Sequence, residues 1–466
     1  MEAVRPTLIF GFGMGLRLAL IARFPVIFGG DPMLRLLHRD RVLISHQLPL
    51  LQLVIVAISQ VTLNYIVVMS AMAAIGAMVG VAFYLLARDL VEEPAAFLAG
   101  LMMTTAPMVA AHSIVPYQES LMLVCVLLAF HYFYAERYLV SSIWLALGCL
   151  TRFEAWIAAP VLAAAYLWRR GWKPAEMARA VVLFGWAPLA WMTFRRGLAP
   201  EGSYVVDLHF NFARLMRWVY LGYITAKFLP VIVLALGLAG VWFLWRDRAK
   251  WVPRVWPLAL FVAMFSVAIL FSAHGEPVDP NGRVASREAH MWMAAVVLLA
   301  TVALEQAGRY RLPLAAVGIA AGMWGADRYV AREASEPRVD LSYRLAKFFD
   351  RELQPGERAL ILSKPWDRSV YDYYLQEARE TGGESGYRAA VRNLAEIADL
   401  SPPDYQRTLV HSRFDHSRLL YESTGCTEWI AVWSDDALAP RDVPPAVETL
   451  RAANLSVRIS KRVCPR

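Results

Sequence analysis

The chain has 466 residues, 58% of them hydrophobic, and a formal net charge of +8 at pH 7. This apolar share exceeds that of an ordinary soluble domain, so a fully soluble enzyme is excluded. Residues 336–466 contain 19 Lys and Arg against 20 Asp and Glu, so the basic excess lies entirely in residues 1–335. Cations concentrated in the apolar part indicate a membrane protein and give no support to a nucleic-acid binder.

Apolar runs recur through residues 1–335 and predict about eleven membrane-spanning helices. The runs are 7–28, 64–87, 95–111, 119–135, 140–151, 154–169, 178–194, 226–245, 255–273, 290–307 and 311–330. The fifth is short for a span. Together they predict a polytopic, all-α membrane domain over residues 1–335.

Short basic connections set the predicted orientation of these helices. The compact ones are 168–173, 245–254 and 308–311. Because cytoplasmic loops are enriched in Lys and Arg, we expect them, with the N-terminus, on the cytoplasmic side of the cell (inner) membrane. The first run lacks a small-residue cleavage site, so we predict that it stays as an uncleaved span. An odd number of spans then places residues 336–466 outside the cytoplasm.

The pattern of residues 336–466 predicts a small extracytoplasmic α/β domain, because helical patterns alternate there with short apolar strands. The predicted helices are 341–353, 370–380 and 446–455, and the predicted strands are 359–363, 408–412, 429–433 and 455–460. An oxidising compartment would favour a disulfide between Cys426 and Cys464, and two unrelated thiols are the alternative.

Two acids stand at the outward ends of predicted spans. Asp31, in GGDP, either caps a helix that starts at the following proline or acts as a general base at the membrane surface, where partial desolvation raises a carboxyl pKa. Glu119, in PYQES, opens the fourth span. An acid that enters an apolar helix is costly unless it is paired or functional. We therefore treat both as candidate catalytic residues.

Arg152 and Glu154, in TRFEAW, lie between two apolar runs at the outer end of the fifth span. They either form a self-neutralising junction between helices, or they position substrate or support Asp31. His112, Tyr117 and Gln118 precede Glu119 and are candidates to join it.

Cations and aromatic residues alternate in the outward segments and predict a site for a lipid head group, with arginine holding phosphate and aromatic rings holding the lipid chain. An interfacial aromatic belt with snorkelling cations is the alternative. The candidate substrate-binding residues in these segments are His209, Arg214, Arg217, Lys227, Arg283, Arg287 and His290.

Signatures of soluble-nucleotide and zinc sites are missing from the sequence, which contains no P-loop, no GxGxxG after a strand and no CxxC pair. An Asp-x-Asp motif is also missing from the outward loops. The cofactor is therefore unknown. A divalent metal held by Asp31, Glu119 and a histidine is left open.

Four motifs in this order, GGDP, HQLPLLQL, PYQES and TRFEAW, resemble the GT-C superfamily of membrane glycosyltransferases. The resemblance is to the group near protein O-mannosyltransferases and lipid A aminoarabinose transferases. It is best over the first 170 residues, and in the tail it extends only to the presence of an outer domain. Many relatives have two adjacent acids in the first outer loop, whereas here Pro32 follows Asp31, so the resemblance does not predict metal use.

The resemblance implies an inverting glycosyltransferase that uses a polyprenyl-phosphate sugar, with Asp31 as the base and Glu119 orienting the acceptor or a metal. The acceptor would be a glycan, a lipid or a protein. A transporter or flippase of lipid-linked sugars is the alternative, and it predicts charged residues across the bilayer. The acids named above all lie near the outer face, which favours the enzyme. A membrane-anchored sensor or scaffold is a third reading.

Overall fold

A computed structural model describes residues 4–29, 32, 35–36, 42, 48–62, 64–198, 215–271, 288–352, 359–362, 429–433, 443–461 and 463. The chain forms two compact units. The first comprises Met1–Arg23, Asp40–Ala57 and Val68–Val330, and the second comprises Phe24–Arg39, Ile58–Val67 and Ala331–Arg466.

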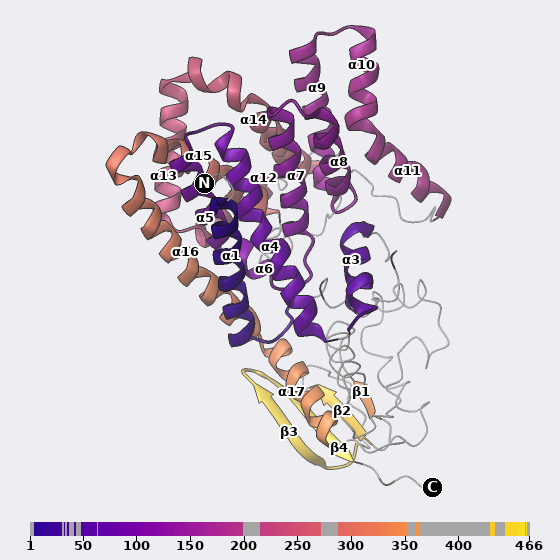
Figure 1. The fold of residues 1–466 in the computed structure, drawn as a ribbon. Helices are drawn as coiled ribbons and strands as arrows, with labels where there is room; N and C mark the ends of the chain where they lie inside the picture. The colour runs from indigo at the N-terminus through magenta and orange to yellow at the C-terminus, as the bar shows by residue number, and fades with distance from the viewer. Residues whose placement is uncertain are drawn as a thin grey trace. The chain divides into compact units, whose positions relative to one another are not determined.

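Helices make up most of the described part of the first unit, and three of them (α3, α4 and α16) reach a few residues into the second (Figure 1). They are α1 (Val4–Arg23), α3 (Pro49–Ser59), α4 (Tyr65–Arg88), α5 (Glu93–Thr105), α6 (Pro107–His112), α7 (Glu119–Tyr134), α8 (Tyr138–Cys149), α9 (Ala158–Arg170), α10 (Pro174–Ala180), α11 (Trp186–Leu198), α12 (Leu215–Phe228), α13 (Val231–Arg246), α14 (Arg248–Phe271), α15 (Ala289–Gln306) and α16 (Arg311–Ala334). Each of the eleven apolar runs overlaps at least one of these helices.

Proline marks several helix starts, because its fixed φ suits the first turn and its missing N–H is not needed there. Pro49, Pro107 and Pro174 each open a helix, and Pro230 immediately precedes α13. The run 226–245 is therefore divided between α12 and α13. The run 178–194 is continuous in the structure, with one π-helical turn, Val181–Gly185, between α10 and α11.

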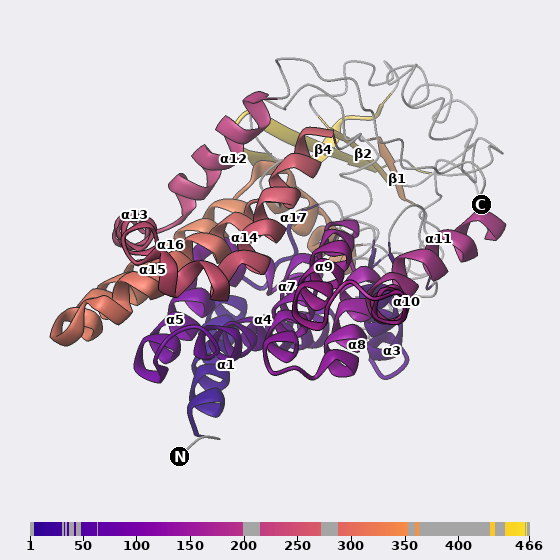
Figure 2. The same cartoon turned by 90° about the horizontal axis from the view of Figure 1, so that it is seen from above.

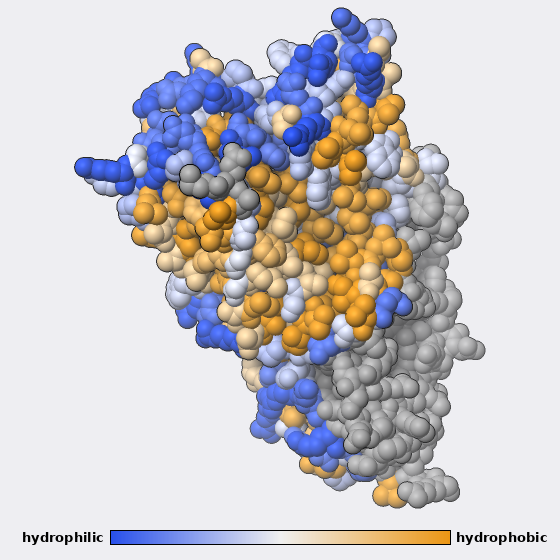
Figure 3. Space-filling view, in the orientation of Figure 1, coloured by the Kyte–Doolittle hydropathy of each residue, from blue (hydrophilic) through white to orange (hydrophobic). Residues whose placement is uncertain are grey.

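The chain is a multi-pass membrane protein. Among the described residues, four helices are long and apolar enough to cross a membrane: α1, α4, the α14 segment Arg248–Leu270 and α15. Shorter apolar helices accompany them, including α7, α8 and α13. Figure 3 shows apolar side chains gathered between two more hydrophilic ends on the face of the first unit that carries α1. Such a band matches the hydrocarbon layer of a bilayer.

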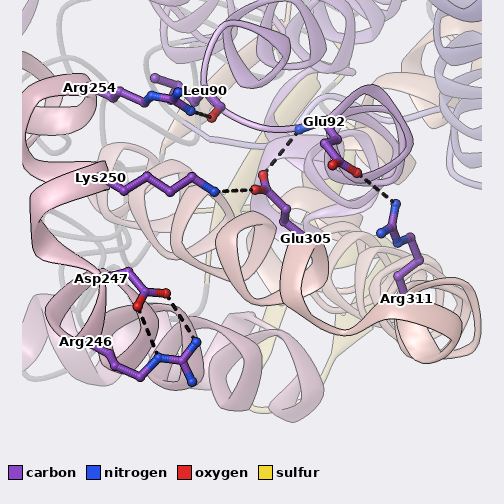
Figure 4. A network of polar contacts seen from close by, with 8 residues as sticks. All are labelled: Leu90, Glu92, Arg246, Asp247, Lys250, Arg254, Glu305 and Arg311. Atoms are coloured by element: carbon purple, nitrogen blue, oxygen red, sulfur yellow. Dashed lines mark hydrogen bonds and ion pairs between the residues drawn. The ribbon is translucent and has the colours of Figure 1, made fainter.

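Basic connections lie close to one another in the first unit (Figure 4), and Arg5 at the start of α1 pairs with the neighbouring Glu93. Lys250 Nζ donates to Glu305 Oε1 over 3.1 Å, and Glu305 Oε2 accepts from the backbone N–H of Glu92 over 3.3 Å. Arg311 lies 3.9 Å from Glu92, and Arg254 donates to the Leu90 carbonyl over 3.5 Å. These contacts join the α4–α5, α13–α14 and α15–α16 connections at the same end of the unit.

Close helix packing rests on small residues, as is common in membrane bundles. Helix α13 lies side by side with α15 (Figures 1 and 2). At their contact a Cβ on Gly240 would overlap the carbonyl oxygen of Leu299 and lie 2.6 Å from its carbonyl carbon. The two helices can therefore approach only because residue 240 has no side chain.

A Gly240→Ala variant is expected to lose about 1–3 kcal/mol of stability, because the added methyl group overpacks a backbone contact that cannot move alone. Gly15→Ala is the matched control, since a Cβ there meets nothing within 4 Å. That change is expected to be neutral or to stabilise the helix. Thermal unfolding in detergent would measure both. Equal midpoints for the two variants would contradict the close contact.

The second unit contains α17 (Pro337–Glu352) and a four-stranded sheet in the order β1-β2-β4-β3. The strands are β1 (Ala359–Leu362), β2 (Trp429–Trp433), β3 (Ala446–Ala452) and β4 (Leu455–Lys461). Strand β1 pairs parallel with β2, and the other two pairings are antiparallel. Phe348 and Phe349 of α17 pack edge-on against Trp429 of β2.

The helix predicted over 446–455 is wrong. Residues 446–452 form strand β3, and a tight turn at Ala453 and Asn454 joins it to β4, with Ala453 at a φ of 49°. Pairing with β4 overrides the local helical pattern, because strand formation depends mainly on its neighbours. The predicted helix 370–380 and strand 408–412 lie outside the described residues.

Candidate functional site

Glu119, Arg152 and Glu154 form a largely buried ion cluster, here called the acid–arginine cluster. Arg152 Nη1 donates to Glu119 Oε1 over 2.6 Å, and Arg152 Nε donates to Glu154 Oε2 over 3.0 Å. A second pairing joins Arg152 Nη2 to Glu154 Oε1. The Glu119 side chain is only 1% exposed. The structure therefore joins Glu119 to the Arg152–Glu154 pair, which the sequence had singled out separately from it.

The cluster is assembled by the ends of two helices. Glu119 is the first residue of α7, where a carboxylate is favoured by the helix dipole. Arg152 has an extended backbone between the end of α8 and the 3-10 turn Phe153–Ile157. The Trp156 indole N–H donates to the Cys149 carbonyl over 2.8 Å and closes this turn. The turn thus aims the Arg152 side chain back toward Glu119.

The charge balance of the cluster is negative, because one guanidinium faces two carboxylates. Burial by itself lowers the pKa of Arg152, but the carboxylates of Glu154 and Glu119 outweigh it and hold that pKa well above its usual range, with a further contribution from Glu288. Arg152 therefore remains a cation that is already engaged by two acids. Glu119 Oε2 is buried and accepts no hydrogen bond from any residue that the structure describes. Among the described residues, it is the carboxylate oxygen of the cluster that has no hydrogen-bond donor.

A second cluster, here called the histidine–tyrosine cluster, consists of His112, Tyr117, His290 and Tyr329. His112 Nε2 lies 2.9 Å from the Tyr329 hydroxyl. The His112 ring centroid lies 4.6 Å from that of Tyr117 and 4.9 Å from that of His290. His112 is 3% exposed and His290 is fully buried. The cluster joins the end of α6 to the beginning of α15 and the end of α16.

A Tyr329→Phe variant is expected to lose about 1 kcal/mol or somewhat more, since it removes the hydroxyl partner of a buried histidine nitrogen. Tyr310→Phe is the matched control, because Tyr310 is 56% exposed and its hydroxyl contacts only the neighbouring Arg309 in the described structure. Chemical denaturation in mixed micelles would compare them. A Tyr329→Phe midpoint equal to that of the control would show that the hydroxyl contact contributes nothing.

The remaining predicted site residues fall into two groups. Arg217 of α12 donates to the Ile269 carbonyl of α14 over 2.9 Å, and Lys227 lies over the rings of Tyr223 and Phe228. Phe228 in turn contacts the Tyr329 ring, at 4.9 Å between centroids, so Lys227 lies near the histidine–tyrosine cluster and Arg217 braces α14. The predicted residues that lie outside the described part are Asp31, His209, Arg214, Arg283, Arg287, Cys426 and Cys464.

Three residues with roles in or near these clusters were not selected from the sequence: Arg17, Trp156 and Tyr329. Trp156 belongs to the TRFEAW motif, which was the available signal for it. Arg17 is a cation in the middle of the first apolar run, a pattern that marks function in membrane proteins. Tyr329 carried no signal, because a tyrosine near the end of a span is typical of the interface.

Among the described side chains, no group of three or more His, Cys, Asp and Glu residues could hold a metal ion. The site considered from the sequence includes Asp31, which is outside that part of the chain.

Comparison with solved structures finds ArnT from Cupriavidus metallidurans bound to undecaprenyl phosphate, with a TM-score of 0.59, 14% identity and 97% of each chain covered. Its apo state gives a TM-score of 0.58 at 14% identity, with 98% of each chain covered. The Archaeoglobus fulgidus oligosaccharyltransferase is found at a TM-score of 0.49 and 11% identity, covering 91% of this chain and 67% of that one. No family model matches the sequence, and no curated protein matches it. The ArnT comparison confirms the GT-C resemblance at the level of the fold.

Proposed function

We propose that this chain is an inverting glycosyltransferase that moves a sugar from a polyprenyl-phosphate carrier to a hydroxyl acceptor outside the cytoplasm. The observation that carries the proposal is the ArnT-like fold over 97% of the chain. The undecaprenyl phosphate bound to ArnT supports a lipid-phosphate donor here. The donated sugar is a hexose or a pentose, and the acceptor is a glycan, a lipid or a protein.

Asp31 is the proposed general base. It takes the proton of the acceptor hydroxyl while that oxygen bonds to the anomeric carbon from the face opposite the phosphate. The bond between the anomeric carbon and the phosphate oxygen breaks, and the lipid phosphate leaves as an anion. Cations of the outward segments, among them Arg214, Arg283 and Arg287, stabilise that anion.

The two clusters have supporting roles in this proposal. Arg152 is engaged by Glu119 and Glu154, which supports a positioning role for it in place of a direct phosphate contact. Glu119 Oε2 is the oxygen that would orient the acceptor hydroxyl. His290 belongs to the histidine–tyrosine cluster and Lys227 lies beside it, over the Phe228 ring that contacts Tyr329.

The proposed topology has eleven spans, with the basic connections of Figure 4 in the cytoplasm. Arg5 and Arg23 mark the two ends of α1, and Arg23 pairs with Asp327 over 2.7 Å at the end opposite to the basic connections. Residues 336–466 then form an extracytoplasmic domain, with a disulfide between Cys426 and Cys464. Non-reducing mass spectrometry of protein isolated from the envelope would detect that disulfide.

The proposal is tested with purified protein in liposomes that contain a radiolabelled polyprenyl-phosphate sugar and an acceptor extract. We expect acceptor-dependent release of label from the carrier lipid and inversion at the anomeric carbon of the product. Intact donor in the presence of a panel of glycan, lipid and peptide acceptors would contradict the proposal.

Transport of lipid-linked sugars is the second candidate function, and the observation that favours it is the position of a cation, Arg17, within a candidate span. Liposomes that lack acceptor discriminate between the two functions. A flippase moves labelled lipid-linked sugar between leaflets under these conditions, whereas a transferase leaves its distribution unchanged.

A further inference from the structure

Arg17 lies on α1 and is fully buried, although α1 is one of the helices able to span a membrane. Its Nε donates to Ser113 Oγ over 2.6 Å, and its Nη1 donates to the Gly13 carbonyl over 3.1 Å. Among the described residues, Nη2 has no hydrogen-bond partner and no carboxylate pairs with the guanidinium. The cation is thus held by neutral groups of the protein and not by an acid.

The surroundings of Arg17 are shaped to admit it. A Cβ on Gly76 of α4 would lie 2.6 Å from Arg17 Nε and would overlap the Ser113 side chain. Gly76 therefore leaves the space in which the contact between Arg17 and Ser113 forms. An arginine at a span end can snorkel to water, but a fully buried one enclosed by α1, α4 and the end of α6 does not. Burying a charge in a membrane domain is costly, and such residues are kept where they act.

Ser113 connects Arg17 to both clusters. It follows His112 directly and begins the α6–α7 turn, residues 113–118, which ends at Glu119. Its hydroxyl donates to the Ala110 carbonyl over 2.9 Å, which leaves a lone pair to accept from Arg17. Arg17 is about 9 Å along α1 from Arg23, at 1.5 Å per residue. Because Arg17 lies this far inside α1, its guanidinium contacts the α6–α7 turn from within a candidate membrane span.

We propose that Arg17 is a positioning residue of the transferase site, which holds the α6–α7 turn so that Glu119 and His112 keep the orientation that transfer requires. This inference rests on the proposed glycosyl transfer. It acts through Ser113, and Arg17 itself does not contact the reacting atoms. This positioning role differs from a transport role, in which Arg17 would be exposed to a passing anion. It also differs from a packing role, in which the loss of any buried hydroxyl would have the same effect on transfer.

Steady-state kinetics test the positioning role with Arg17→Gln, Ser113→Ala and the double variant. We expect Arg17→Gln to lower kcat about 10- to 100-fold, as small misplacements of a site do, with the donor KM changed less than about 2-fold. Because both residues act through one contact, the double variant should be no worse than Arg17→Gln. Additive losses, or a raised KM at unchanged kcat, would overturn the inference.

Ser141→Ala is the matched control. Ser141 is also fully buried, and its hydroxyl donates to the Ala129 carbonyl over 2.7 Å, within the α7–α8 pair and away from the α6–α7 turn. It should leave kcat unchanged even where it lowers stability. Arg17→Lys retains a cation with one donor group and should recover part of the lost kcat. If Arg17→Gln does not fold, Arg17→Lys and Ser113→Ala carry the comparison.

Hydrogen–deuterium exchange separates this inference from the proposed function, because it needs no substrate. Arg17→Gln and Ser113→Ala should raise exchange in peptides covering residues 113–118, while Ser141→Ala should not. Unchanged exchange in the turn overturns the inference even if the wild-type protein is an active transferase. If exchange is raised in these two variants but the wild-type protein shows no transfer, Arg17 holds the turn and the proposed function has failed.

Discussion

An Asp31→Asn variant is expected to lose about 10²- to 10⁴-fold in kcat, the contribution typical of a general acid or base. The amide keeps the size of the side chain and its ability to cap a helix, but it cannot take the acceptor proton. A structural cap would tolerate this change, because Asn is as good an N-cap residue as Asp. The substitution thus discriminates between the two interpretations of GGDP. The rate at which label is transferred from a polyprenyl-phosphate sugar measures this loss in kcat.

Asp40→Asn is the matched control for this experiment, because Asp40 is the next acid in the same outward segment and has no assigned role. We expect it to retain nearly full activity. Asp31→Glu should recover part of the lost rate, since it restores a carboxylate at a shifted position. Full transfer by Asp31→Asn would exclude Asp31 as the base.

An Arg152→Met variant is expected to lose about 3–5 kcal/mol of stability and most of its transfer activity. Removing one partner of a buried ion cluster leaves the remaining charges uncompensated, which costs more than the cluster itself contributes. Here the uncompensated groups are Glu119, which is 1% exposed, and Glu154. Thermal unfolding and transfer assays on the same preparation would measure the two losses.

Arg23→Met is the matched control, since it breaks the ion pair with Asp327 at the same end of the unit, where Arg23 is 64% exposed. An exposed pair contributes about 0–1 kcal/mol, so this variant should unfold close to wild type. Adding Glu119→Gln to Arg152→Met removes one buried charge and should recover stability without recovering transfer. Equal stability of Arg152→Met and Arg23→Met would show that the acid–arginine cluster is not a buried ion network.

Local patterns in the sequence were sufficient for the membrane class and for the helices. A span is a continuous apolar stretch, so a run such as 64–87 is recognised without knowledge of its neighbours, and it is found as α4. Proline starts and basic connections are also local signals. The motifs PYQES and TRFEAW indicated Glu119, Arg152 and Glu154, as well as the GT-C fold that the ArnT comparison confirms. Strand β3 was missed because its pairing with β4, and not its own pattern, decides its conformation.

Only the tertiary structure decided which of these residues meet. Glu119 and Arg152 are 33 residues apart, Arg17 and Ser113 are 96 apart, and His112 and Tyr329 are 217 apart. Spacing along a helix predicts neighbours within a turn or two, but contacts between helices depend on how the whole bundle packs. The roles of Gly76 and Gly240 could not be predicted from the sequence for the same reason. Each is one of many small apolar residues in the helices until the atoms that face it are known. The sequence by itself therefore determined the membrane class, the apolar helices and the candidate residues, and helix packing decided that Glu119 is engaged by Arg152 and that Arg17 contacts the turn leading to it.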